Sequence, residues 1–120
     1  MAVELKHLQL EDADGITVVG FVDSNLIFET ALIEEVGHEL QSLLTERGCK
    51  KILIDFDRVQ YLSSSMLAQL TKLAKEAARD HCQLKLTGLG PVLKDAFRIS
   101  HFDSFFDIHE SKGSAVKSFR

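Results

Sequence analysis

The sequence predicts an α/β fold, and three observations support this prediction. Short apolar segments typical of β-strands alternate along the chain with segments whose apolar residues recur at helical spacing. Near the start, two strand-like segments flank the turn-forming residues 12–15, as expected for an antiparallel hairpin. The run Ile52-Leu53-Ile54 contains no polar residue, which is typical of a strand covered on both faces. We therefore expect a mixed central sheet of four or five strands, the hairpin first and parallel strands after it, packed with three or four helices.

The N-terminal half begins with the hairpin and continues into a long helix. Residues 3–10 alternate in polarity and residues 16–22 are β-branched and apolar, so both segments are predicted strands. Residues 29–47 are a predicted amphipathic helix, with Gly48 as its C-terminal cap. Its apolar face is expected to consist of Leu32, Val36, Leu40 and Leu43. The strand at 51–56 follows and is expected at the centre of the sheet.

The C-terminal half continues the alternation. The second helix is predicted to begin at the serines 63–65 and to end near Asp80, and a strand at 82–87 leads to a third helix that starts at Pro91. A last strand at 105–108 precedes a terminal helix or tail at 111–120. The residues expected to face the core from the second and third helices are Leu67, Leu70, Ala74 and Ala77, flanked by Met66 and Leu73, and then Val92, Leu93, Ala96 and Phe97. Residues 102–106 are expected in the core rather than at a dimer interface.

Length and composition restrict the function classes. With 120 residues, 45% of them hydrophobic, the chain is expected to form one domain spanning residues 1–120. The net charge of -4 and the lack of clustered cations exclude a typical nucleic-acid surface. No apolar run approaches the roughly 20 residues that cross a bilayer, and the N-terminus does not resemble a signal peptide, so we expect a cytoplasmic protein without membrane insertion. Cys49 and Cys82 are expected to be free thiols, and the five scattered histidines predict no metal site.

The densest polar cluster lies at residues 57–65, where a predicted strand ends and a helix begins. Unpaired N–H groups at a helix N-terminus favour a phosphate or carboxylate, although serine is also simply a favoured N-cap residue. Asp55 and Asp57 form either an acid–base pair or, as we favour, a solvated strand end. Neither GxxxxGK[ST] nor GxGxxG occurs, and no histidine is placed beside a serine nucleophile. We therefore expect no cofactor and no enzymatic activity.

Three segments together resemble the STAS domain of the anti-sigma factor antagonist family. "ILIDFDRVQYLSSSMLAQL" is similar to the central motif of the family, an apolar strand and loop followed by Asp-Ser-Ser/Thr-Gly-Leu at the start of a helix. "VGFVDSNLIFETALIEEV" resembles its Gly-x-Leu-Asp loop, with Gly20 and Asp23 matching. "LTGLGPVLKDAFRISHFDSFFDIHES" is similar to its small-Pro-x-Val turn and closing strand. The resemblance covers residues 3–110 and implies a STAS fold.

The resemblance implies a non-enzymatic switch in bacterial signalling. In this family an anti-sigma kinase phosphorylates a serine at the start of the second helix, and the unphosphorylated form binds that kinase and releases a sigma factor. Ser64 takes the position of the phospho-acceptor, with Ser63 and Ser65 as alternatives, while Ser63 replaces the motif aspartate and Met66 the glycine. The surface implied to bind the kinase-like partner comprises Asp23, Ser24, Asp57, Tyr61, Leu62, Ser63, Ser64, Ser65 and Met66. Two alternatives remain for the Met66 side chain, which either extends this surface or turns into the core.

A second hypothesis is that the domain is an accessory module that binds a nucleotide, a lipid or another anion, for example in a transporter complex. The N-terminus of the second helix would then hold the anionic group instead of a phosphorylated serine.

Overall fold

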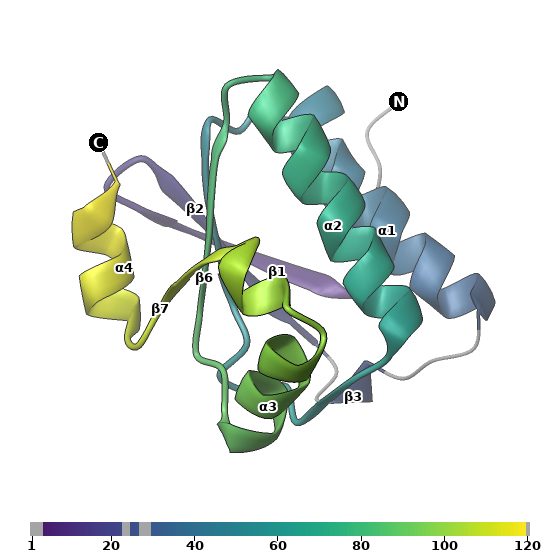
Figure 1. Ribbon diagram of the computed structural model, residues 1–120. Helices are drawn as coiled ribbons and strands as arrows, with labels where there is room; N and C mark the ends of the chain where they lie inside the picture. Colours follow the sequence, from purple (N-terminus) through teal and green to yellow (C-terminus); the bar gives the residue numbers. More distant parts are fainter. Residues whose placement is uncertain (1–3, 23–24, 27–29, 120) are drawn as a thin grey trace.

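The fold is a five-stranded mixed sheet with helices on both faces, in a computed structural model that describes residues 4–22, 25–26 and 30–119 (Figure 1). The order of strands in the sheet is β1-β2-β4-β6-β7, with β1 antiparallel to β2 and the other neighbours parallel. The elements are β1 (Leu8–Ala13), β2 (Ile16–Phe21), β3 (Asn25–Leu26), α1 (Thr30–Thr45), β4 (Lys51–Asp55), β5 (Tyr61–Leu62), α2 (Ser64–Arg79), β6 (Gln83–Thr87), α3 (Pro91–Ile99), a 3₁₀ turn (Phe102–Ser104), β7 (Asp107–His109) and α4 (Lys112–Ser118). The predicted α/β fold is confirmed.

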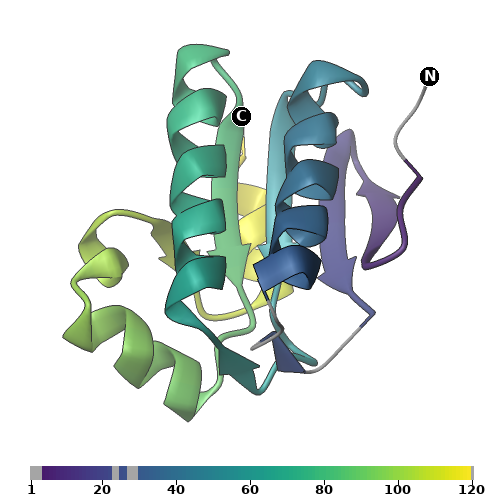
Figure 2. The same cartoon turned by 90° about the vertical axis from the view of Figure 1, so that its right-hand side faces the viewer.

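The central strand and the hairpin follow from local sequence. Ile52, Leu53 and Ile54 of β4 are fully buried, because α1 and α2 cover one face of the sheet and α4 packs on the other (Figures 1 and 2). In the hairpin, Asp14 and Gly15 both have positive φ angles, of 54° and 82°. A two-residue turn needs positive φ at both positions if its twist is to match the right-handed twist of the two strands that it connects. The two strands therefore continue up to the turn, to Ala13 and from Ile16. The first strand spans Leu8–Ala13, so it begins and ends further along the chain than the predicted residues 3–10.

Three residues expected in the core are instead exposed. Leu32 of α1 is 38% exposed and the neighbouring Ile33 is buried, so the buried face of α1 is rotated by one residue near its start. Val92 of α3 is 58% exposed, whereas Leu93 and Phe97 are buried. Phe105 is also exposed, because the 3₁₀ turn delays the last strand to Asp107 and turns Phe106 inward instead, with its ring against Phe97. Phe102 is partly buried and packs against the core.

A buried carboxylate joins the N-terminal segment to α1. Oε1 of Glu39 accepts hydrogen bonds from the backbone N–H groups of Lys6, His7 and Leu8, at 3.0, 3.0 and 3.2 Å. Glu39 is only 3% exposed. These three bonds satisfy both the carboxylate and the backbone donors of the segment that enters β1, whose register with β2 begins at Leu8 opposite Phe21.

Both cysteines are free thiols. Burial raises the pKa of Cys82 from 9.0 to about 11, and the neighbouring Cys49 acts in the same direction. The Cys82 thiol is therefore protonated, and a weak nucleophile, at neutral pH.

The described residues contain no group of three or more His, Cys, Asp or Glu side chains arranged to hold a metal ion. Within the same residues, no helix combines the length and apolar character needed to cross a bilayer.

Candidate functional site at the start of α2

The carboxyl ends of β4 and β6 and the N-termini of α2 and α3 lie at one end of the molecule. Figure 2 shows α1 and α2 rising from this end, with the small strand β5 beneath α2, β3 next to it beneath α1, and α3 to the side. β3 and β5 pair in parallel, with Asn25 opposite Tyr61 and Leu26 opposite Leu62. The long loop after β4 is thereby held against the segment that follows β2, which brings together two of the three segments singled out in the sequence.

The three serines have different roles. Ser63 is the N-cap of α2, and its Oγ accepts a hydrogen bond of 3.1 Å from the backbone N–H of Met66. Ser64 and Ser65 are the first two helical residues and are exposed. Among the described residues, their backbone N–H groups have no hydrogen-bond acceptor, as expected in the first turn of a helix. The Ser64 hydroxyl therefore lies on the surface beside unpaired donors and the positive end of the helix dipole.

The N-cap geometry explains why serine can stand where the family motif has aspartate. Both residue types are favoured N-caps, because both place a side-chain oxygen within reach of the N–H groups of the first turn. In this chain Ser63 performs that task.

Ser63→Ala is expected to lower the free energy of unfolding by about 1 kcal/mol, the usual cost of losing an N-cap side chain. Ser63→Asp is the matched control and should stay within about 0.5 kcal/mol of the wild type, because the carboxylate can accept the same bond. Urea unfolding followed by circular dichroism measures both values. An equal loss in the two variants would contradict the capping role of Ser63.

The structure decides between the two alternatives for Met66. Its side chain is 0% exposed and belongs to the core between the helices and the sheet. Including Met66 in the partner-binding surface was therefore wrong, since only its backbone is near the site. Tyr61, at 51% exposed, and the half-buried Leu62 remain as apolar surface next to the serines. Asp23 and Ser24 lie outside the described residues.

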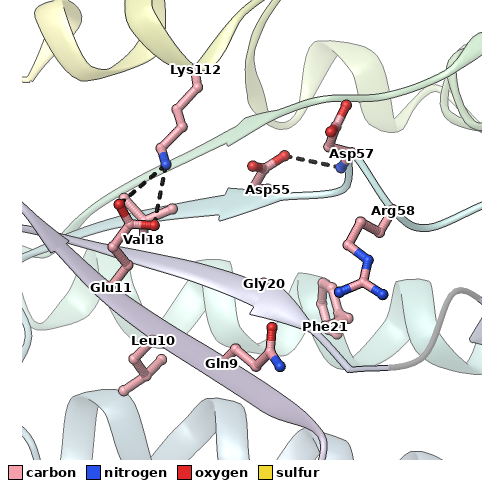
Figure 3. A pocket seen from close by; sticks show the side chains of 10 residues that line it. All are labelled: Gln9, Leu10, Glu11, Val18, Gly20, Phe21, Asp55, Asp57, Arg58 and Lys112. Atoms are coloured by element: carbon pink, nitrogen blue, oxygen red, sulfur yellow. Dashed lines mark hydrogen bonds and ion pairs between the residues drawn. The ribbon is translucent and has the colours of Figure 1, made fainter.

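Asp55 and Asp57 do not form an acid–base pair. The Asp55 carboxylate accepts a 2.9 Å hydrogen bond from the backbone N–H of Asp57, so it stabilises the turn after β4. Figure 3 shows the Asp57 carboxylate pointing away from Asp55 and from Arg58. Gly88 packs against this turn with a φ of +79°, and a Cβ at that position would lie 2.5 Å from Oδ1 of Asp55. The two aspartates thus belong to a closely packed strand end, one structural and one solvated.

Two pockets flank this end of the sheet. The pocket in Figure 3, of about 320 Å³, lies on the face that α4 only partly covers, where Lys112 of α4 forms an ion pair with Glu11. The other pocket, of about 550 Å³, lies between the loop after β4 and the start of α3. Its lining includes Asp57, Tyr61 and Val92. The α3 side of this pocket was not predictable from the sequence, because the apolar pattern of α3 placed Val92 in the core.

The comparisons with known proteins agree with this geometry. The family model of the STAS domain matches residues 7–115. BtrV of Bordetella bronchiseptica, which carries the name anti-sigma factor antagonist, is 28% identical over 116 residues, 94% of each chain. A STAS-domain anti-sigma factor antagonist from Planctomyces limnophilus has a similar structure, with a TM-score of 0.79, 18% identity and coverage of 96% of this chain and 98% of that one. The phosphorylated form of Bacillus SpoIIAA has a TM-score of 0.68 at 16% identity, covering 94% and 99%. This chain therefore belongs to the STAS domain family and resembles its anti-sigma factor antagonists.

Proposed function

We propose that this protein is a bacterial, cytoplasmic partner-switching module that binds a serine-kinase-like anti-sigma factor and thereby regulates transcription. The proposed switch is phosphorylation of Ser64 by that partner. The observation that carries the proposal is the exposed hydroxyl of Ser64 at the first position of α2. The names of the relatives support it, since BtrV is named as an anti-sigma factor antagonist and a phosphorylated form of SpoIIAA has been described. STAS domains of this kind are generally non-enzymatic binding modules, in accord with the structural role of Asp55.

The proposed partner surface surrounds Ser64. It comprises Asp23, Ser24, Asp57, Tyr61, Leu62, Ser63, Ser64 and Ser65. Its apolar part is Tyr61 with the half-buried Leu62, and its described acidic part is Asp57. A phosphate on Ser64 would add roughly -1.5 to -2 charges to a chain whose net charge is already -4. The helix N-terminus tolerates this charge locally, whereas an apolar or acidic face of the partner does not.

The proposal is tested with the full chain and its cellular partners. The tagged protein is used to capture partners from its native bacterium, and a captured kinase-like protein is then purified and incubated with the chain and ATP. We expect mass spectrometry to place one phosphate on Ser64, to find none in Ser64→Ala, and to find it unchanged in the matched control Ser65→Ala. If no kinase-like protein is captured, or if the phosphate resides on Ser63 or Ser65, the proposal is wrong in its partner or in its acceptor.

The hypothesis of an anion-binding accessory module has less physical support. The pocket between the loop after β4 and the start of α3, which includes Tyr61 three residues before Ser64, is lined by the acids Asp57 and Glu110, and no lysine or arginine lines it. The two carboxylates would therefore repel an anionic ligand in this pocket.

A further inference from the structure

The pocket of about 550 Å³ beside Tyr61 has the composition of a docking site for a protein side chain. Its floor is apolar and buried, consisting of Val59, Leu89 and Leu93 with exposed fractions of 2–7%. Its rim carries two of the most exposed large apolar side chains among the described residues, Tyr61 at 51% and Val92 at 58%. A buried apolar floor with an exposed apolar rim is the usual form of a pocket that accepts an anchoring side chain at an interface.

Gly90 leaves this pocket open, although the backbone does not require glycine there. Its φ of -75° is accessible to every residue type, and a Cβ built on it would have no neighbour within 4 Å. Gly90 is thus unlike Gly88, whose positive φ and close contact with Asp55 do require glycine. Gly90 is the N-cap of α3 and makes no side-chain cap bond, and the missing side chain also leaves space in the pocket that it lines.

The charges at the pocket specify its occupant. Asp57 and Glu110 are the charged residues in the lining, and both are acidic. Glu110 already forms an ion pair with Lys94 at 3.2 Å. Among the described residues, the Asp57 carboxylate has no hydrogen bond or ion pair, so it is available to a cation from outside.

We propose that this pocket receives an apolar side chain of the anti-sigma partner, and that a lysine or arginine adjacent to it in the partner pairs with Asp57. The inference rests on the proposed function and extends its surface from the start of α2 across the loop to α3. Tyr61 connects the two parts, because it lines the pocket and lies three residues before Ser64. In this arrangement the pocket contributes binding affinity for the partner, and phosphorylation of Ser64 lowers that affinity.

Val92 and Ile99 provide a matched pair of variants. Both lie on α3, both are apolar and exposed, at 58% and 74%, and only Val92 lines the pocket. The substitutions Val92→Asp and Ile99→Asp add the same charge to the same helix. Because Val92 is the second residue of α3, an acid there is favoured by the helix dipole, and the variant is expected to fold.

The test is a titration of the full-length variants with the purified kinase-like protein that the wild type captures. We expect Val92→Asp to bind at least about tenfold more weakly than the wild type, and Ile99→Asp to bind within about twofold. Gly90→Leu, which fills the pocket without a charge, should also weaken binding. Asp57→Asn should weaken it several-fold and flatten its dependence on salt, because one ion pair is lost.

The outcomes separate this inference from the proposed function. If the wild type binds and Val92→Asp and Gly90→Leu bind equally well, the pocket is not part of the interface, and the inference is overturned while the proposed function stands. If the wild type itself does not bind, the proposed function fails, and the inference fails with it. If sedimentation shows that Val92→Asp instead dissociates a dimer of this chain without affecting the partner, the occupant is a second copy and the inference is likewise wrong.

Discussion

Ser64→Asp is expected to bind the kinase-like partner on the order of a hundredfold more weakly than the wild type. The substitution places a permanent carboxylate at the first residue of α2, in the middle of the proposed surface. A charge that must lose its hydration at an interface without a partner of opposite sign costs several kcal/mol, and about 2.7 kcal/mol corresponds to a hundredfold. Titration calorimetry with the purified partner measures the change.

Stability distinguishes a switch from simple damage. An acid in the first turn of a helix is favoured by the helix dipole, so the free energy of unfolding of Ser64→Asp should equal or slightly exceed that of the wild type. Ser64→Ala is the uncharged control and should retain binding within a few-fold, because it removes only a hydroxyl. Equal affinities of Ser64→Asp and Ser64→Ala would show that charge at this position does not control the partner.

Glu39→Ala is expected to lower the free energy of unfolding by about 3–4 kcal/mol. The substitution removes the acceptor of three backbone N–H groups, those of Lys6, His7 and Leu8, and leaves a cavity in a buried site. Each unsatisfied donor costs about 1–3 kcal/mol when it stays buried, and partial access of water to the N-terminal segment reduces the sum. Chemical denaturation of the variant measures the loss.

Glu35 is the matched control for this prediction. It lies one helical turn before Glu39 and is also close to His7, with Oε2 at 3.6 Å from Nε2, but its side chain is 52% exposed. Because exposed ion pairs contribute little, Glu35→Ala should cost less than about 1 kcal/mol. Hydrogen exchange of the amides of residues 6–8 should accelerate in Glu39→Ala and remain slow in Glu35→Ala. Similar losses in the two variants would contradict the special role assigned to Glu39.

The order of the helices and of the five strands of the main sheet was predictable because each depends on local periodicity. The two-residue strands β3 and β5 were not predicted, because they form only by pairing with each other. The unbroken apolar run 52–54 identified the strand that is buried on both faces, and the turn residues before Ile16 identified the hairpin. A serine cap for α2 followed from the residue type at positions 63–65, and the structure assigns it to Ser63. These features are determined within a few residues of the chain, so a single sequence is sufficient to infer them.

The prediction failed where burial depends on how a helix is rotated against the sheet. Periodicity accepts either Leu32 or Ile33 as a core residue, and either Val92 or Leu93, since neighbouring residues differ by about 100° around a helix. The crossing of each helix over the sheet makes the choice, and it buries Ile33 and Leu93. The same geometry turns Met66 into the core, although the sequence left both orientations open.

By itself, the sequence determined that this chain forms a mixed α/β sheet, begins its second helix at the serines and belongs with STAS domains, because local patterns and a recognisable motif are sufficient for these conclusions. The tertiary structure alone decided which of those residues face solvent and which distant segments meet. In the folded chain, Glu39 binds backbone N–H groups more than 30 residues away, and Gly88 packs against the turn at Asp55. A pocket also forms between Tyr61 and Val92. Contacts of this kind join residues far apart in the chain, and no local pattern encodes them, because they arise only when helices and strands pack together.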